Sequence, residues 1–294
     1  MVVNRVIGRF APSPTGPLHF GSLLAAISSY ASAKHQGGLW RLRIDTIDPP
    51  REQAGAADSF ISTLEAHGLH WDGDIVWQHQ RIARYREVLA ELIAKNLVYA
   101  CDCSRSARAE AGVLDCLGPC RHGEHHPNAS DAAWRLRSPA TASTYHDRLH
   151  GELSELLSRS CGDAILWRRD DLPAYQLATV VDDHDMSISE VVRGTDLLDN
   201  TARQCHLADS LGWARPQFLH IPMLINSTGQ KLSKQSHALA LNNNHAAENV
   251  FLALQLLAQQ PPAELRQAFI DEIITWAVAH WSESALPIGD IKQP

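Results

Sequence analysis

Short apolar runs of strand length alternate along this chain with longer stretches that have the length of helices. The strand-like runs are NRVIGRF, LWRLRI, LVYACD, AAWRLRS, AILWRR, SISEVVRG and FLHIPMLI, and helices are expected at 21–36, 51–67, 79–95 and 196–211. Parallel strands need a long crossover between them, which is usually a helix. The alternation therefore predicts an α/β fold built on a parallel sheet.

Two segments depart from this alternation. Residues 101–130 are rich in Gly, Pro, His and Cys, which predicts an insertion between two halves of the α/β domain at 1–100 and 131–240. Residues 241–294 have a helical pattern: AAENVFLALQLLAQQ, a Pro-Pro break, and AELRQAFIDEIITWAVAHW. We therefore expect one α/β domain in two halves, one insertion and a helical C-terminal segment.

The composition is that of an ordinary globular protein. With 294 residues, of which 45% are hydrophobic, the chain can bury about three quarters of its surface. No apolar run reaches the roughly 18 residues that span a bilayer, and the N-terminus lacks the apolar core of a signal peptide. We therefore expect a cytoplasmic protein without membrane contact. The formal net charge of −7 excludes a broad basic coating for nucleic acid, although a local basic patch is compatible with it.

The cysteines follow a pattern that suits a metal better than disulfides. In a reducing compartment six cysteines are expected to be thiols or metal ligands. Two close pairs, CDC at 101–103 and CLGPC at 116–120, would supply four thiolates for tetrahedral zinc. The spacing alone leaves three histidines as alternative ligands, namely His122, His125 and His126. Cys161 and Cys205 stand alone and are interpreted as core thiols.

The first strand runs into a loop of Pro and Gly at 12–17 and then into LHFGS at the start of an apolar helix. The free N–H groups and the positive dipole end of a helix start form an anion site. Gly21 would let a phosphate or an adenine approach the backbone, and His19 would add a hydrogen-bond donor. Taken alone, the motif fits equally well a Pro-rich loop in which Ser22 caps the helix.

Four motifs, in this order, resemble the class I aminoacyl-tRNA synthetases of the glutamyl type. They are RFAPSPTGPLHFGS, LRIDTIDPPR, VVDDHDMSISEVVRGTDLL and KLSKQ, and together they span about residues 5–240. By itself, the lysine pair of KLSKQ would fit a solvated polar turn. The segments IDPPRE, HWDGD and KLSKQ are similar to those of the short paralogues of glutamyl-tRNA synthetase within this family.

The resemblance implies a Rossmann-like catalytic domain with a parallel sheet and a small zinc-containing insertion. It implies that ATP with Mg²⁺ activates L-glutamate to glutamyl-adenylate without tRNA. The glutamate would then pass to the queuosine base at the wobble position of tRNA(Asp), whose anticodon stem-loop would be the RNA partner. Because the short paralogues lack an anticodon-binding domain, we expect none in this chain.

Two other functions stay open from the sequence. One is a truncated glutamyl-tRNA synthetase that charges the 3′ end of tRNA, and the other is a non-enzymatic paralogue that senses glutamate or a nucleotide. Full-length glutamyl enzymes resemble one another in needing tRNA for activation. Glutamate-dependent ATP–pyrophosphate exchange without tRNA would therefore distinguish a short paralogue from a truncated glutamyl-tRNA synthetase. The oligomeric state and the RNA-contacting surface are not determined by the sequence.

The resemblance also assigns site residues. The catalytic residues would be His19, Gly21, Lys231, Ser233 and Lys234, of which His19, Gly21 and Lys234 would bind ATP. The glutamate site would consist of Arg9, Ala11, Ser13, Asp45, Tyr175 and Arg193. The two arginines would bind the two carboxylates, in an order that the sequence does not fix. One structural zinc ion per chain would be held by Cys101, Cys103, Cys116 and Cys120.

One departure from the family pattern concerns the glutamate site. Where the family has Glu-Asp, this chain has Asp45 and Thr46, so the carboxylate is one methylene shorter. If Asp45 binds the substrate ammonium, the backbone must lie closer or a water must bridge the gap. The nearby Asp182, Asp183 and His184 could suggest a metal site, but adjacent side chains on one element point in different directions, so we expect them to bind no metal.

Overall fold

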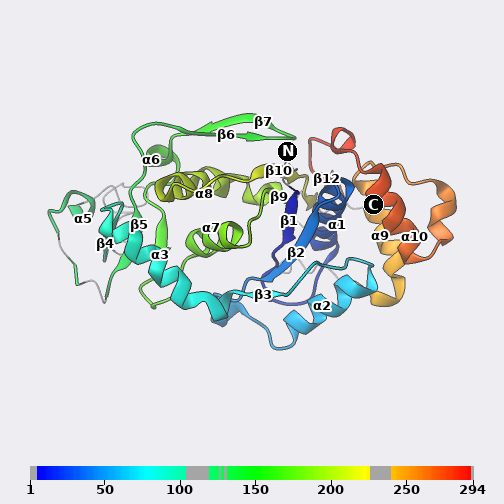
Figure 1. Ribbon diagram of the computed structural model, residues 1–294, viewed down its shortest axis with the longest axis horizontal. Helices are drawn as coiled ribbons and strands as arrows, with labels where there is room; N and C mark the ends of the chain where they lie inside the picture. Colours follow the sequence, from blue (N-terminus) through cyan, green and yellow to red (C-terminus); the bar gives the residue numbers. More distant parts are fainter. Residues whose placement is uncertain (1–4, 104–118, 126, 129–130, 226–239, 293–294) are drawn as a thin grey trace.

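The computed structural model describes residues 5–103, 119–125, 127–128, 131–225 and 240–292, which form the elongated molecule in Figure 1. Its strands are β1 (Ile7–Phe10), β2 (Leu39–Ile44), β3 (Val76–Trp77), β4 (Val98–Cys101), β5 (Ala133–Leu136), β6 (Ser143–Asp147), β7 (Gly151–Glu155), β8 (Ile165–Trp167), β9 (Glu190–Gly194), β10 (Gln217–Ile221), β11 (Leu224–Ile225) and β12 (Ile291–Lys292). Its helices are α1 (Phe20–His35), α2 (Ala56–Ala66), α3 (Ile82–Ala94), α5 (Pro119–His122), α6 (Leu157–Ser160), α7 (Tyr175–Asp185), α8 (Leu198–Leu211), α9 (Ala246–Leu256) and α10 (Ile270–His280). Within these described ranges, no helix is both long and apolar enough to cross a membrane.

Parallel strands form the centre of the molecule, as the sequence predicts. One group has the order β1-β2-β3 with parallel pairing throughout, and in the other β6, β10 and β9 are parallel neighbours. The two groups meet where the Ser189 N–H donates to the Ile7 carbonyl at 2.9 Å, so β9 lies beside β1. The carboxyl ends of these strands therefore lie along one edge, where parallel sheets usually bind ligands.

Part of the strand prediction is wrong in direction. Three of the expected strands, β4, β5 and β8, form a separate antiparallel sheet instead of joining the parallel one. This sheet lies at the end of the molecule opposite to α9 and α10 (Figure 1). A short apolar run indicates a buried strand, but it does not show whether the neighbouring strand is parallel or antiparallel. Hydrophobic periodicity therefore could not distinguish the two kinds of sheet.

The antiparallel hairpin of β6 and β7 was not expected from the sequence at all. In β6, STYHD, buried and exposed side chains alternate, so the strand is buried on one side only, and two of its three buried residues are polar. Its last residue, Asp147, is fully buried. A search for continuous apolar runs misses such a strand, because half of its residues face water.

The helices expected at 21–36, 51–67, 79–95 and 196–211 are found, with changes at their ends. The helix expected at 51–67 begins only at Ala56, after a short 3₁₀ turn at Pro49–Arg51. The start of α1 is capped by His19, whose Nδ1 accepts from the Ser22 N–H at 3.2 Å, so capping by Ser22 is wrong. Helix α7 was not expected, because its VVDDHD core is too polar for a simple amphipathic pattern.

The C-terminal helices belong to the main hydrophobic core. Leu24 and Ile27 of α1, Leu254 of α9 and Ile273 of α10 are buried in one cluster that also contains Trp40 of β2. The parallel sheet therefore packs on α1, and α1 packs on α9 and α10. The loop before α1 lies against the carboxyl end of β2, where the Asp45 N–H donates to the Pro12 carbonyl at 2.9 Å.

Candidate functional site

A pocket of about 600 Å³ opens at the carboxyl ends of β1, β2, β9 and β10. The structure brings every predicted glutamate-site residue to its lining, together with the two predicted residues at the start of α1. These residues are Arg9, Ala11, Ser13, His19, Gly21, Asp45, Tyr175 and Arg193. Since they come from segments up to 184 positions apart in the sequence, only the fold can assemble them.

The predicted Lys231, Ser233 and Lys234 lie outside the described residues. The described residues on both sides of this stretch lie at the pocket. Leu224 lines the pocket, and Ala240 forms an isolated β-bridge with His19.

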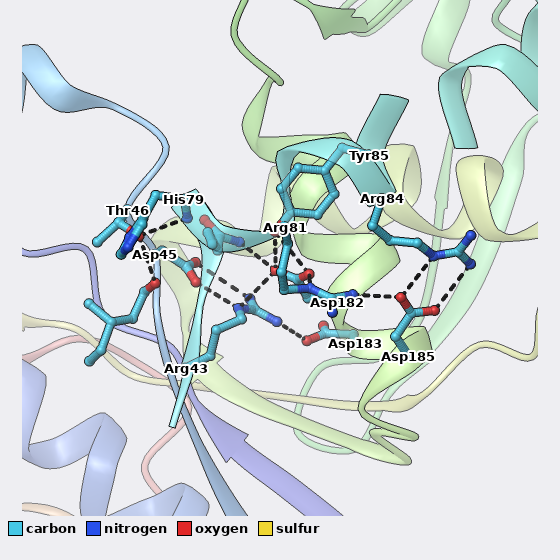
Figure 2. Close-up of polar contacts among 12 residues, drawn as sticks. Arg43, Asp45, Thr46, His79, Arg81, Arg84, Tyr85, Asp182, Asp183 and Asp185 are labelled. Atoms are coloured by element: carbon cyan, nitrogen blue, oxygen red, sulfur yellow. Dashed lines mark hydrogen bonds and ion pairs between the residues drawn. The ribbon is translucent and has the colours of Figure 1, made fainter. Parts of the chain in front are cut away.

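Arg43 connects the carboxylates behind the pocket (Figure 2). Its side chain is fully buried and also lines the pocket. Its Nε donates to Asp45 Oδ1 at 2.6 Å, and its Nη1 donates to Asp183 Oδ1 at 2.6 Å. Nε also lies 3.6 Å from Asp182 Oδ2. One arginine therefore holds three acidic residues, from β2 and from α7, in a fixed arrangement.

Two of the carboxylates held by Arg43 have opposite pKa shifts. Burial raises the pKa of Asp45 to about 6, although the ion pair with Arg43 opposes this shift. Burial also acts to raise the pKa of Asp183, but Arg9 and Arg43 outweigh it and hold the pKa below its usual value. Asp183 therefore stays a carboxylate, whereas Asp45 can change protonation near neutral pH.

The substitution of Thr46 for the family's second acidic residue has a local explanation. The Oγ1 of Thr46 lies 2.8 Å from His79 Nδ1 and accepts from the His79 N–H at 3.0 Å (Figure 2). Thr46 is buried and is not among the residues that line the pocket. Its hydroxyl therefore holds the loop that carries His79 and does not compensate for the shorter Asp45.

Asp182 lies deeper than Asp183 and is surrounded by donors. It accepts from the Tyr85 hydroxyl at 2.8 Å, from Gln78 Nε2 at 2.9 Å and from Arg81 Nε at 2.6 Å. These donors come from the start of α3 and the 3₁₀ turn before it. Arg43 contacts both adjacent aspartates, but their other partners differ, since Asp183 also pairs with Arg9.

The two arginines predicted to bind carboxylates differ in how many of their guanidinium nitrogens already have a protein partner. Arg9 is buried and has one ion pair, from its Nε to Asp183 Oδ1 at 3.3 Å. In Arg193, which is 4% exposed, Nε donates to His220 Nε2 at 3.0 Å and Nη2 to Thr201 Oγ1 at 2.8 Å. Arg193 Nη1 is buried without a hydrogen-bond partner in the described part of the chain. Each arginine thus has nitrogen atoms left for a ligand in the pocket.

The sequence analysis missed Arg43 and the role of Asp182 and Asp183. A signal was present, because LWRLRID places Arg43 between two apolar residues, Leu42 and Ile44, of a strand. A buried arginine needs a carboxylate partner, and VVDDHD offers two adjacent ones. The pairing across 140 positions could not be found from spacing alone.

The cysteine cluster lies at the edge of the antiparallel sheet. The Sγ atoms of Cys101, Cys103 and Cys120 lie within 4.8 Å of one another, and those of Cys103 and Cys120 are 3.6 Å apart. A tetrahedral zinc ion with Zn–S bonds of about 2.3 Å needs sulfur atoms about 3.8 Å apart. The three thiols therefore fit a zinc site. Cys116 lies outside the described residues.

Among the histidines considered as alternative zinc ligands, His125 belongs to a possible ligand group. His125 Nε2 lies 3.0 Å from both carboxylate oxygens of Asp102, and these two residues form a second possible ligand group with Cys120. His122 is exposed at the end of α5, and His126 is outside the described residues. The interpretation of Cys161 and Cys205 as core thiols is confirmed, because both are buried in a hydrophobic cluster that is separate from the cluster of Cys101, Cys103 and Cys120.

Comparisons with known proteins agree with this geometry. The family model described as tRNA synthetases class I (E and Q), catalytic domain, matches residues 5–261. A glutamyl-Q tRNA(Asp) synthetase from Citrobacter koseri is 46% identical over 285 residues, which is 96% of this chain and 93% of that protein. Another from Pseudomonas aeruginosa is 44% identical over 287 residues, which is 97% of each chain.

Among solved structures, a glutamate tRNA ligase from Elizabethkingia meningosepticum in complex with its amino acid has a TM-score of 0.82 and 22% identity. The match covers 98% of this chain and 67% of that one, and at this identity it shows the fold alone. The family model and the full-length relatives go further. The chain belongs to the class I tRNA synthetases of the glutamate and glutamine group, and within them to the glutamyl-Q tRNA(Asp) synthetase family.

Proposed function

We propose that this protein uses ATP with Mg²⁺ to activate L-glutamate and transfers the glutamyl group to the queuosine base at the wobble position of tRNA(Asp). The observation that supports this best is the pocket itself. It combines two buried arginines, Arg9 and Arg193, with the carboxylate Asp45 and the start of α1. The names of the full-length relatives support the choice of tRNA.

In the activation step, the α-carboxylate oxygen of glutamate attacks the α-phosphorus of ATP. The bond to the leaving oxygen breaks, and pyrophosphate carries the electron pair away. Negative charge that develops on the phosphate oxygens is stabilised by fixed donors and cations. We assign this role to His19 and the N-terminus of α1 on one side and to Lys231, Ser233 and Lys234 on the other.

Substrate selection would depend on charge matching. Arg9 and Arg193 would each bind one carboxylate of glutamate, and Asp45 would accept from the ammonium group. Ala11, Ser13 and Tyr175 complete the lining of this part of the pocket. The fold and the pocket residues are compatible with this assignment, since all of these side chains face one cavity.

ATP–pyrophosphate exchange with glutamate in the absence of tRNA tests the proposal. We expect exchange without tRNA. Exchange only with tRNA would favour charging of the 3′ end, and no exchange under either condition would favour a sensor. The transfer step is tested with labelled glutamate on tRNA(Asp) trimmed of its 3′-terminal CCA. Labelling of the trimmed tRNA only when it carries queuosine supports the proposal, and labelling that needs the CCA end contradicts it.

Glutamate should be activated at least about tenfold better than glutamine, measured as kcat/KM in the exchange assay. Glutamine presents an amide in place of one carboxylate, so one buried arginine would keep an unpaired charge. Leaving such a charge unpaired costs ~2–5 kcal/mol. Comparable rates with the two amino acids would contradict the assignment of Arg9 and Arg193.

The activity should depend on pH through Asp45. Because burial raises the pKa of Asp45 to about 6, its carboxyl group gains a proton as the pH falls through that value. A neutral carboxyl group cannot pair with the substrate ammonium, so kcat/KM for glutamate should fall about tenfold per pH unit below about pH 6. The Asp45→Asn variant should lack this dependence and have a lower plateau. A parent profile without this fall would rule out Asp45 as the ammonium acceptor.

The Lys234→Ala variant should lose on the order of 10² or more in kcat for exchange, with a small change in KM for glutamate. The reason is that its charge would be used only as negative charge develops on the phosphates. Single-turnover kinetics with saturating ATP measures this. A variant whose kcat is within a few-fold of the parent value would mean that KLSKQ is only a polar turn.

We further propose that residues 101–130 form an insertion around one zinc ion, with Cys116 as the fourth ligand beside Cys101, Cys103 and Cys120. In this division, residues 1–100 and 131–240 would form the catalytic domain and 241–294 its helical C-terminal part. When bound, the zinc would hold the insertion in place, and it would take no part in the reaction. The three described thiols, at zinc-like spacing, support this assignment.

A further inference from the structure

Three neighbouring strands carry a line of buried polar side chains that ends at Arg193. Asp147 is the last residue of β6, His220 lies on the adjacent β10, and Arg193 lies opposite His220 on β9. His220 Nδ1 lies 2.7 Å from Asp147 Oδ2, and its Nε2 accepts from Arg193 Nε at 3.0 Å. Asp147 and His220 are both fully buried.

The network defines the protonation of His220. Arg193 is always a cation, so its Nε must donate, and Nε2 of His220 must be the acceptor. The imidazole proton must then be on Nδ1, where it is donated to Asp147. This assignment follows from the donors and acceptors around the ring.

Asp147 is held as a carboxylate, which is the protonation state that this arrangement requires. Its Oδ1 accepts from the N–H groups of Leu149 and His150, and its Oδ2 accepts from the N–H and Nδ1 of His220. Burial acts to raise the pKa of Asp147, but these hydrogen bonds outweigh it and keep the pKa below its usual value. Burial lowers the pKa of His220; Asp147 opposes the shift, while Arg193 and His150 add to it. The pair is therefore a carboxylate beside a neutral imidazole.

We propose that Asp147 and His220 are positioning residues for the substrate. They fix the imidazole as an acceptor, and this acceptor orients the Arg193 guanidinium so that Nη1 is the nitrogen left for a substrate carboxylate. Thr201 Oγ1 completes the arrangement by accepting from Nη2 at 2.8 Å. The role in glutamate binding rests on the proposed function, whereas the tautomer of His220 does not.

Two substitutions of His220 separate the acceptor from the donor. In His220→Gln the side-chain amide reaches the position of Nε2 and can accept from Arg193. In His220→Asn the amide lies near the position of Nδ1, so Asp147 keeps a donor but Arg193 loses its acceptor. A hydrogen bond to a charged group is worth about tenfold or more in affinity. We expect His220→Asn to raise the KM for glutamate at least about tenfold and His220→Gln to restore it to within about threefold of the parent.

The control is His67→Asn, because His67 is also fully buried but contacts Thr63 and Asn249 instead of the pocket. It should lower the melting temperature and leave the KM for glutamate unchanged. The KM for ATP should stay within about twofold of the parent in all three variants, since a general loss of structure would change both constants.

The tautomer is measured directly on the parent protein. With ¹⁵N-labelled histidine, the His220 signals are assigned by their absence in His220→Gln, and we expect a proton on Nδ1 and none on Nε2 at neutral pH. A proton on Nε2 overturns the inference, and so do equal KM values for glutamate in the two His220 variants. A parent that shows no exchange at all would overturn the proposed function and the role in glutamate binding, while the tautomer would still report whether the network orients Arg193.

Discussion

The Arg43→Met variant is expected to lose about 3–5 kcal/mol of folding free energy and all measurable glutamate activation. Methionine keeps an unbranched apolar side chain in place of the arginine stem but removes the cation shared by Asp45, Asp182 and Asp183. Breaking a buried ion pair by removing one partner leaves uncompensated charge, which is the source of this large loss. Urea denaturation followed by circular dichroism gives the free energy of unfolding, and the exchange assay gives the activity.

The matched control is Arg41→Met on the same strand. Arg41 donates to the Asp72 carbonyl at 2.7 Å and, among the residues that the structure describes, forms no ion pair with Asp45, Asp182 or Asp183, so its loss should amount to about 1 kcal/mol or less. Equal losses in the two variants would contradict the role given to Arg43.

The deficit of Arg43→Met should also depend on pH with a defined sign. Without the cation, the folded-state pKa of Asp45, which is already above its usual value, rises further, and the pKa of Asp183, which Arg43 helps to hold below its usual value, rises as well. The variant therefore becomes less stable relative to the parent as the pH rises above about 4 and recovers as the pH falls. A deficit that stays constant over this range would mean that lost packing, and not charge, destabilises the variant.

The assembly of the pocket could be predicted because its residues belong to motifs that keep their own local structure. Arg9, Ser13 and His19 lie within one strand-loop-helix segment, and Asp45 follows directly after a strand. Each of these positions is set by short-range features, namely a strand end, a Pro-Gly loop and a helix start. The order of these motifs along the chain was then enough to assign the pocket residues by resemblance.

The supporting polar residues could not be predicted in the same way. Arg43 meets Asp183 across 140 positions, and His220 meets Asp147 across 73. Even where the local sequence indicates burial, as for Arg43, it does not identify the partner, since the pairing depends on which elements become neighbours. The missed β6 shows the same limit, because its alternating pattern hides a buried aspartate at the last position.

Removal of zinc, by a chelator or by Cys120→Ser, should make the insertion at 101–130 sensitive to protease while the pocket keeps its structure. Among the described residues, the apolar cluster around the thiols consists of Tyr99, Cys101 and Cys120, with Cys103 packed against it, and it contains no aliphatic side chain. So little apolar area does not offset the entropy of ordering the backbone. A structural zinc ion contributes roughly 10 kcal/mol or more in small domains, which is enough to do so.

The contacts of α5 with the rest of the protein should be lost together with the metal. Arg121 pairs with the buried Asp163 and donates to the Ser138 carbonyl at 3.0 Å, which ties α5 to the segment after β5. The pocket, by contrast, is formed by other strands and by α1, so exchange activity should stay within a few-fold of the parent.

Metal analysis on single variants identifies the ligands. Cys120→Ser and Cys116→Ser should each lose the zinc, whereas Cys161→Ser, at a buried thiol in a different cluster, should keep it. His125→Ala should also keep it, because His125 contacts Asp102 in the described structure. Full zinc occupancy in Cys116→Ser together with loss in His125→Ala would make His125 the fourth ligand. A parent protein that purifies without zinc and with a protease-resistant insertion would exclude the metal site, because the insertion would then be ordered by contacts other than its thiols.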